Sequence, residues 1–135
     1  MRKLMLLFPA ILVMALSLVA CGGSPATPAA TTQPPAASTI TGDAAAGKLV
    51  FQNNCVVCHN ADGSGGKQIG TATSADIRSA ALTDTYKGDW SLVKRAILTG
   101  KDQDGQDLDA VMPRWQGKLS DTDVNNVIAY LQTLK

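Results

Sequence analysis

The run Cys55-Val56-Val57-Cys58-His59 restricts what this chain can fold around more than any other feature of the sequence. On a helical turn, positions i, i+3 and i+4 share one face, so both thiols and the imidazole can reach one planar group. A C-x-x-C-H run is the attachment signal for c-type haem, in which two thiols bond to the porphyrin and the histidine ligates iron. We therefore expect one covalently attached haem c, held by Cys55, Cys58 and His59.

The second axial ligand is predicted by counting candidate side chains. His59 is the only histidine in the chain, and Met112 is the only methionine outside residues 1–20. A His/Met ligand pair raises the potential of electron-carrying haems. That pair has one possible assignment here, so the predicted metal ligands are His59 and Met112.

Residues 1–20 have the layout of a secretory signal peptide, in which Arg2 and Lys3 precede a mostly apolar run. The run is short for a membrane span, which needs roughly 20 residues. It ends in Leu-Val-Ala-Cys at residues 18–21, which resembles the bacterial lipobox. We expect lipidation at Cys21, with an uncleaved N-terminal anchor and an incidental cysteine as the alternative. Either arrangement places the rest of the chain outside the cytoplasm and next to a membrane.

The segment from Cys21 to residue 41 is predicted to be a flexible linker. After Cys21 it holds mainly Pro, Ala, Thr, Gly and Ser and no charged residue, so it cannot bury enough apolar surface to become ordered. As a coil such a segment spans roughly 25 Å, and about 60 Å if extended in the polyproline form. This reach would let a membrane-anchored domain move between partners.

The number of cysteines agrees with these assignments. The chain has three, and an odd number in an exported protein calls for an explanation. A lipid on Cys21 and a haem on Cys55 and Cys58 leave none over. The alternatives are a Cys55–Cys58 disulfide, thiol–disulfide exchange or zinc binding. A disulfide leaves His59 and Met112 unexplained. An exchange motif is expected near a βαβ pattern, and this sequence has no clear strand pattern. Structural zinc usually has four protein ligands, and the motif provides only three.

Residues 42–135 suit one small domain that contains few aromatic residues. A protein core of this size is thin, and a buried haem would supply the missing apolar mass. The whole chain has a formal net charge of +1, and two of its basic residues, Arg2 and Lys3, belong to the predicted signal peptide. The domain is therefore close to neutral, which argues against binding of nucleic acid.

Helices are predicted in three places. Asp43 can cap a helix over residues 44–54, and Asp89 can cap one over residues 90–99 that stops at Gly100. Ser120 caps the last helix, whose apolar stripe is formed by Val124, Val127, Ile128 and Leu131.

The remaining segments are predicted to be irregular. Residues 60–83 are rich in Gly, Ser and Thr and should wrap around the haem, with Ile77 and Leu82 directed inward. Residues 101–109 should form a solvated acidic loop, since the carboxylates lack the order of a calcium loop. No stretch alternates clearly between apolar and polar residues, so the fold class should be all-α.

Taken together, residues 43–135 resemble the monohaem class I cytochrome c family. The matching pieces are the haem motif with the Gly-rich loop after it, Gly-Lys-Leu-Val-Phe at 47–51, Met-Pro-Arg-Trp at 112–115, Leu-Ser-Asp at 119–121 and Val-Ile-Ala-Tyr-Leu at 127–131. The resemblance implies a small cytochrome c-type helical domain wrapped around one haem. It also implies that Met112 arrives on a loop as the distal ligand and that Arg114 and Trp115 lie near the haem propionates.

The resemblance further implies that the first and last helices cross at right angles. Gly47 would permit their close approach, and Phe51 would pack against Val127 and Tyr130. One departure concerns the proximal histidine. Many members of the family have Gly-Pro-x-Leu after the haem motif, whose backbone carbonyl accepts the proton of the second ring nitrogen. The corresponding residues 66–71 contain no proline, and the predicted acceptor is a carbonyl near Ile69 or Gly70.

The leading hypothesis is a membrane-tethered electron-transfer protein, not an enzyme, exported to the extracytoplasmic or periplasmic side. The iron would cycle between Fe(II) and Fe(III) with His59 and Met112 in both axial positions, which leaves none for a substrate. The expected partners are redox proteins of a respiratory or photosynthetic chain that dock through brief contacts of small area. The alternative is catalysis or gas sensing at the haem, which requires an open sixth position.

Overall fold

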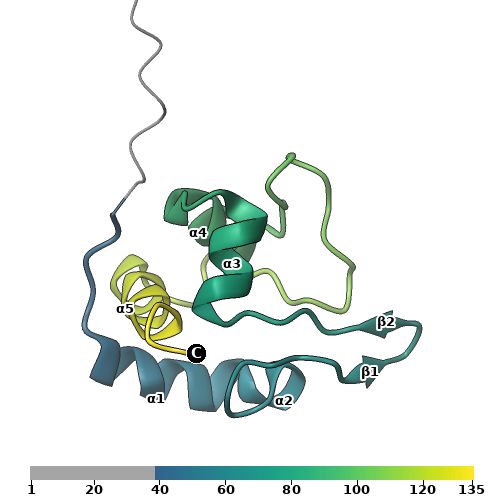
Figure 1. Ribbon diagram of the computed structural model, residues 1–135, viewed down its shortest axis with the longest axis horizontal. Helices are drawn as coiled ribbons and strands as arrows, with labels where there is room; N and C mark the ends of the chain where they lie inside the picture. Colours follow the sequence, from purple (N-terminus) through teal and green to yellow (C-terminus); the bar gives the residue numbers. More distant parts are fainter. Residues whose placement is uncertain (1–38) are drawn as a thin grey trace, which may run out of the picture. The chain divides into compact units, whose positions relative to one another are not determined.

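The computed structural model describes residues 39–135 (Figure 1), so the predicted signal peptide, Cys21 and nearly all of the predicted linker lie outside the described residues. The helices are α1 (Ala44–Asn54), α2 (Val56–His59), α3 (Ser79–Tyr86), α4 (Trp90–Thr99) and α5 (Asp121–Leu131). A small antiparallel hairpin consists of β1 (Gln68–Ile69) and β2 (Ala72–Thr73), paired Gln68 to Thr73 and Ile69 to Ala72. The predicted helical fold class is confirmed, and the hairpin is an addition to it.

All three predicted helix starts are capped by the expected side chains. Asp43 Oδ1 accepts hydrogen bonds from two first-turn amides of α1 at 2.8 and 3.2 Å. Asp89 Oδ1 accepts from the amide two residues further on at 2.9 Å. Ser120 and Asp123 form a capping box, in which each side chain accepts from the backbone amide of the other. These caps pair amides that have no partner within the helix.

Helix α1 packs closely against α5, which lies across it in Figure 1. Gly47 is buried at this contact, where a Cβ atom would lie 1.9 Å from the carbonyl oxygen of Asn126. One turn later Phe51 is fully buried, and its ring centroid lies 5.3 Å from that of Tyr130. The predicted close approach at Gly47 and the predicted contact between Phe51 and Tyr130 are confirmed.

The start of the domain is also attached to α5. A Cβ atom on Gly42 would lie 2.3 Å from the carbonyl oxygen of Asn125. The backbone amide of Asp43 donates to the side-chain oxygen of Asn126 at 2.8 Å. The chain therefore enters α1 through a segment that lies directly on the backbone of α5.

The hydrophobic core joins α5 to α1 on one side and to α3 and α4 on the other. Its buried members are Phe51, Leu82, Tyr86, Val93, Ala96, Val124, Val127, Ile128 and Leu131. The inward position predicted for Leu82 is confirmed, and Ile77 packs against this core while partly exposed. None of the helices within residues 39–135 is both long and apolar enough to cross a bilayer.

The prediction of irregular chain over residues 60–83 is wrong for its last residues, because helix α3 begins at Ser79. Its N-cap residue, Arg78, makes no capping hydrogen bond through its side chain. Leu82 and Tyr86, one turn apart, are its buried residues, and Lys87 ends it in the left-handed conformation with φ of 54°. Tertiary burial of one face, rather than local sequence, accounts for this short helix.

Candidate haem site

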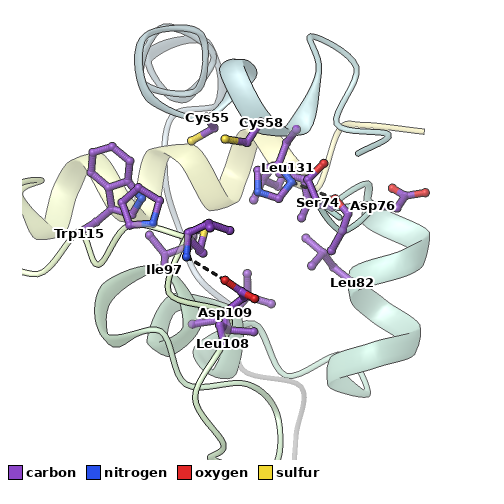
Figure 2. Close-up of a pocket in the computed structure, with 18 of the residues that line it drawn as sticks. Cys55, Cys58, Ser74, Asp76, Leu82, Ile97, Leu108, Asp109, Trp115 and Leu131 are labelled. Atoms are coloured by element: carbon purple, nitrogen blue, oxygen red, sulfur yellow. Dashed lines mark hydrogen bonds between the residues drawn. The ribbon is translucent and has the colours of Figure 1, made fainter. Parts of the chain in front are cut away.

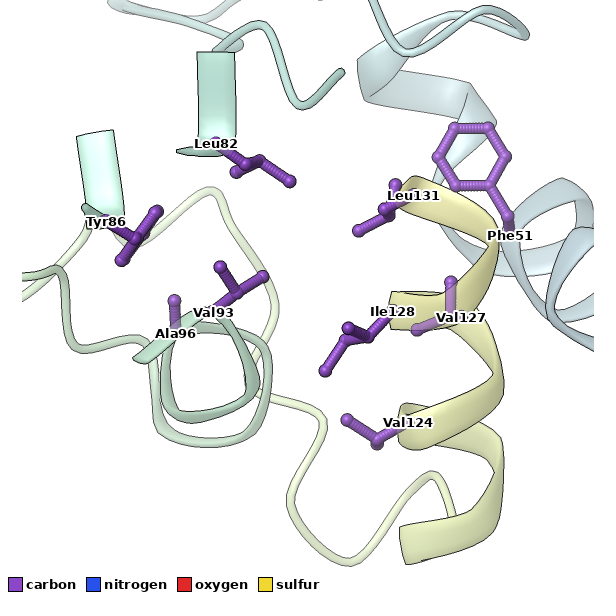
Figure 3. Packing of buried hydrophobic residues seen from close by; sticks show 9 residues of the cluster. All are labelled: Phe51, Leu82, Tyr86, Val93, Ala96, Val124, Val127, Ile128 and Leu131. Atoms are coloured by element: carbon purple, nitrogen blue, oxygen red, sulfur yellow. The ribbon is translucent and has the colours of Figure 1, made fainter. Parts of the chain in front are cut away.

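A cavity of about 390 Å³ lies among α2, the hairpin, α3, α4 and the loop that precedes α5 (Figure 2). Its walls are mainly hydrophobic, and most of the buried core residues also line it (Figure 3). A volume of this size is typical of small-molecule and cofactor sites. A bound apolar group would therefore complete the core of this small domain, as its composition predicts.

The two cysteines and the histidine of the motif all line this cavity. Cys55 both ends α1 and precedes α2, and its carbonyl accepts from the amide of His59 at 3.0 Å. This single helical turn directs Cys55 and Cys58 to the same side of the cavity (Figure 2). Their thiols are not joined by a disulfide. Burial, with a smaller contribution from Cys58, raises the pKa of Cys55 to about 11.

His59 is the one buried polar side chain among the described residues, with 8% of its surface exposed. Its ring Nδ1 lies 2.9 Å from the backbone carbonyl oxygen of Ala75. A carbonyl only accepts, so Nδ1 carries the proton, and in the neutral imidazole Nε2 then has a free lone pair. A histidine oriented in this way is suited to binding a metal through Nε2.

The predicted acceptor for this hydrogen bond, a carbonyl near Ile69 or Gly70, is wrong. Residues 69 and 70 lie at the tip of the hairpin, where Gly70 adopts φ of +61° in the two-residue turn. The returning strand then brings Ala75 back beside His59. A Cβ atom on Gly65 would lie 2.2 Å from the Ala75 carbonyl oxygen, so Gly65 permits this close approach.

An Asp76–Arg78 pair follows directly after Ala75. The carboxylate of Asp76 accepts from the amide of Arg78 at 2.9 Å and from its Nε at 3.0 Å. These hydrogen bonds from Arg78 hold the pKa of Asp76 below its ordinary value. The pair fixes the segment that presents the Ala75 carbonyl to the imidazole.

Met112 enters the cavity lining from a different part of the chain, the loop between α4 and α5. Its amide donates to the carbonyl of Asp109 at 3.0 Å, and the amide of Val111 donates to the Asp109 carboxylate at 3.0 Å. The cavity thus brings together all four predicted haem-binding residues, Cys55, Cys58, His59 and Met112. Two thiols, an imidazole with a free Nε2 and a thioether in an apolar cavity fit a covalently attached haem.

The two residues expected near the propionates differ in position. Trp115 lines the cavity, whereas Arg114 is not among the lining residues. The guanidinium of Arg114 donates to backbone carbonyls of the loop that carries Met112, including that of Leu108 at 2.8 Å. Sequence reasoning missed this role of Arg114, since recognition of backbone carbonyls leaves no pattern of side chains.

A family model for cytochrome c matches residues 44–135. Over 89 residues the chain is 35% identical to cytochrome c6 of Leptolyngbya boryana, a match that covers 66% of this chain and 89% of that protein. The chain belongs to the cytochrome c family. This cytochrome c is also 32% identical over 97 residues to cytochrome c-554(547) of Halothiobacillus neapolitanus, covering 70% of this chain and 99% of that protein.

A third relative of this cytochrome c is a longer protein. The chain is 30% identical over 93 residues to the Cbb3-type cytochrome c oxidase subunit CcoP of Cereibacter sphaeroides. The match covers 67% of this chain and 27% of that subunit. The chain thus spans only about a quarter of the length of this oxidase subunit.

Membership of the family settles the class of cofactor. The protein carries covalently attached haem c. The predicted resemblance, fold and cofactor are therefore confirmed. The alternatives of a disulfide, thiol exchange or zinc at Cys55 and Cys58 do not hold, because the C-x-x-C-H arrangement belongs to a cytochrome c.

Proposed function

We propose that this protein is a membrane-tethered electron carrier whose haem c is bonded to Cys55 and Cys58 and ligated by His59 and Met112. The observation that carries the proposal is the hydrogen bond from His59 Nδ1 to the Ala75 carbonyl, which leaves Nε2 free in a cavity that Met112 also lines. Bound haem c supplies a one-electron Fe(II)/Fe(III) couple at this site.

Each residue has a distinct part in this proposal. The thiols of Cys55 and Cys58 would add across the two vinyl groups of haem, and the resulting thioether bonds would fix the group to the turn at the start of α2. The Ala75 carbonyl orients the imidazole of His59 and makes it a stronger ligand. Met112 supplies a thioether, which together with histidine favours a high potential. The apolar walls exclude water and lower the local dielectric constant, which also tunes the potential.

Electron transfer without catalysis follows from this ligand set. His59 and Met112 would together supply the protein ligands of the iron and would leave no position for a substrate. The same two side chains would serve both oxidation states, so little would have to move on electron transfer. Catalysis or gas sensing would require that Met112 is absent from the iron or is readily displaced.

Partners are proposed to be a donor and an acceptor protein that meet the haem edge near Val57 and Val111. Both valines line the cavity and are exposed, by 70% and 42% of their surfaces. Small, brief contacts of this kind are usual for redox encounters. The names of the relatives, a cytochrome c6 and an oxidase subunit, fit either a separate carrier or a subunit of a larger complex.

The proposed location is the extracytoplasmic or periplasmic side of a membrane, in a respiratory or photosynthetic chain. It depends on the sequence of the first 41 residues: a signal peptide at 1–20, a lipid on Cys21 and a flexible linker to residue 41. The electron-carrying domain would then comprise residues 42–135.

The ligand assignment is tested by Met112→Ala in the full chain, made in a host that exports the protein and attaches haem. We expect haem to stay attached, the potential to fall and the iron–thioether charge-transfer absorption of the ferric protein to disappear. Ferrous protein should then bind carbon monoxide rapidly.

Val111→Ala, at the neighbouring cavity-lining position, is the control and should keep the absorption. Survival of that absorption in Met112→Ala would contradict the assignment, and rapid binding by the unaltered protein would favour catalysis or sensing.

A further inference from the structure

Within the loop that carries Met112, the side chain of Arg114 donates hydrogen bonds to several backbone carbonyls. Nη2 of Arg114 donates to the carbonyl of Leu108 at 2.8 Å. Nη1 donates to the carbonyl of Asp109 at 3.2 Å and also to that of Met112. One guanidinium thus joins three backbone carbonyls of residues 108–112, including that of the proposed ligand.

The same side chain is seated against the end of α4. Gly100 ends that helix with φ of +70°, and a Cβ atom there would lie 1.9 Å from Nε of Arg114. The carbonyl of Gly100 also accepts from the amide of Leu108 at 2.8 Å. Gly100 therefore leaves the space in which the Arg114 side chain reaches the carbonyls of the loop.

The chain directly after Arg114 is hydrogen-bonded to α4 through its backbone. The amide of Trp115 donates to the carbonyl of Ile97 at 3.2 Å, and the amide of Gln116 donates to that of Leu98 at 3.0 Å. Leu108 has one backbone hydrogen bond to the end of α4, at Gly100, whereas the backbone hydrogen bond of Met112 stays within the loop. The guanidinium of Arg114 joins residues 109–112 to the segment that is fixed on α4. Arginine suits this task because its planar donors stay charged and can serve several acceptors at once.

We propose that Arg114 is a positioning residue that keeps Met112 in place as a ligand of the iron. The inference rests on the proposed ligation by Met112 and extends it to a residue that does not line the cavity. Without these donors, water would hydrogen-bond to the three carbonyls instead. The loop of residues 108–112 would then move away from the cavity more often. A competing small ligand would then replace the thioether more easily.

The experiment measures imidazole binding to the ferric holoprotein, made from the full chain, through the change in the main haem absorption bands, and in proteins that have the iron–thioether absorption its loss reports displacement of Met112. Arg114→Leu removes the donors, and Arg114→Lys keeps the charge with a single ammonium group. Lys48→Gln, on the exposed face of α1, removes one positive charge away from the loop. Met112→Ala serves as the reference for an iron that lacks the thioether.

We expect imidazole affinity to rise about tenfold or more in Arg114→Leu, the effect of losing one hydrogen bond to a charged group. Arg114→Lys should show a smaller rise, on the order of threefold, because one ammonium cannot replace the planar donor pair. Lys48→Gln should match the unaltered protein. Thermal unfolding of each variant is recorded as well, because a purely structural role would lower stability and leave affinity unchanged.

The outcomes separate this inference from the proposed function. Unchanged affinity in Arg114→Leu, beside a raised affinity in Met112→Ala, would overturn the role of Arg114 and leave the ligation by Met112 standing. If Met112→Ala matches the unaltered protein, Met112 is not a ligand and both proposals are wrong. If Arg114→Leu does not fold, the imidazole affinity of Arg114→Lys decides the question. If that affinity equals that of the unaltered protein, the inference is overturned.

Discussion

Nδ1 of His59 donates to the backbone carbonyl of Ala75 over 2.9 Å, joining α2 to the segment that follows the hairpin. The acceptor is a main-chain atom, so no change of the Ala75 side chain removes it. Its position depends instead on Gly65, whose missing side chain lets the Ala75 carbonyl approach. The hydrogen bond to the proposed proximal ligand can therefore be altered through a neighbour that is not itself a cavity-lining residue.

Gly65→Ala should displace the Ala75 carbonyl and weaken this hydrogen bond. The added Cβ would lie 2.2 Å from the carbonyl oxygen, and the residue adopts φ of +63°. We expect the free energy of unfolding to fall by about 1–3 kcal/mol from the backbone conformation alone, which is the usual cost for a residue other than glycine. The close contact of the added Cβ with the carbonyl oxygen should add to this loss. A less polarised imidazole donates less to iron, so the potential should rise. Denaturant unfolding and redox titration measure the two effects.

Gly66→Ala is the matched control for that variant. Gly66 has a similar φ of +78°, but nothing lies within 4 Å of an added Cβ atom. It should show the backbone strain alone and keep the potential of the unaltered protein. Equal potentials in the Gly65 and Gly66 variants would show that the Ala75 carbonyl does not tune the iron.

Gly47→Ala should destabilise the protein although alanine normally stabilises a helix relative to glycine by about 0.8–1.0 kcal/mol. The added Cβ would lie 1.9 Å from the carbonyl oxygen of Asn126, so α1 and α5 must move apart. Overpacking of this kind typically costs about 1–3 kcal/mol. Urea unfolding measures the change. Lys48→Ala, on the exposed side of α1, should stay within about 0.5 kcal/mol, and a stabilised Gly47→Ala would refute the close contact.

Asp76→Asn should lower stability in a manner that depends on pH. Hydrogen bonds from Arg78 hold the pKa of Asp76 below its ordinary value of 3.8, so the folded state binds this proton less readily than the unfolded chain. The stabilisation is complete above pH 3.8 and is lost as the pH falls through the lower pKa of the folded state. Thermal unfolding measured between pH 2 and 6 (roughly the range that spans the shift) should show a difference in stability between Asp76→Asn and the unaltered protein. That difference should shrink as the solution becomes more acidic. Asp84→Asn, which removes a carboxylate 3.6 Å from Lys87 on the surface, is the control for charge alone.

Cys21→Ser should move the protein from the membrane to the soluble fraction without changing the haem spectrum. Serine cannot accept the thioether-linked lipid, and the domain itself would keep all its haem-binding residues. Fractionation of cells that express both forms, followed by optical spectra, gives the result. If the serine variant stays with the membrane, the N-terminal apolar run is itself the anchor.

Local chemistry made part of this fold predictable from the sequence. Asp43, Asp89 and Ser120 were expected to cap helices because a short polar side chain can bond the free amides of the first turn, and each does so. The cavity also contains the predicted set of Cys55, Cys58, His59 and Met112, because spacing and residue type together determine such a set.

Other features depend on contacts between distant residues and had no local signal. Helix α3 is stabilised by burial of Leu82 and Tyr86 against the rest of the core, and its start lacks a side-chain cap. The hairpin consists of two-residue strands, too short to produce an alternating pattern. Since that hairpin sets which carbonyl returns to His59, the identity of Ala75 as the acceptor could not be predicted either.

The seat of Gly42 and Asp43 on α5 has a mechanical consequence. A force applied to the chain before residue 39 would act first on the contacts at the start of the domain. There Gly42 lies against the backbone of α5 and the amide of Asp43 donates to Asn126. The eleven residues of α1, about 16 Å of helix, separate these contacts from Cys55. The packed helices α1 and α5 would thus bear the tension in a tether. The residues around the haem site would keep their positions while the domain moves from one partner to the next.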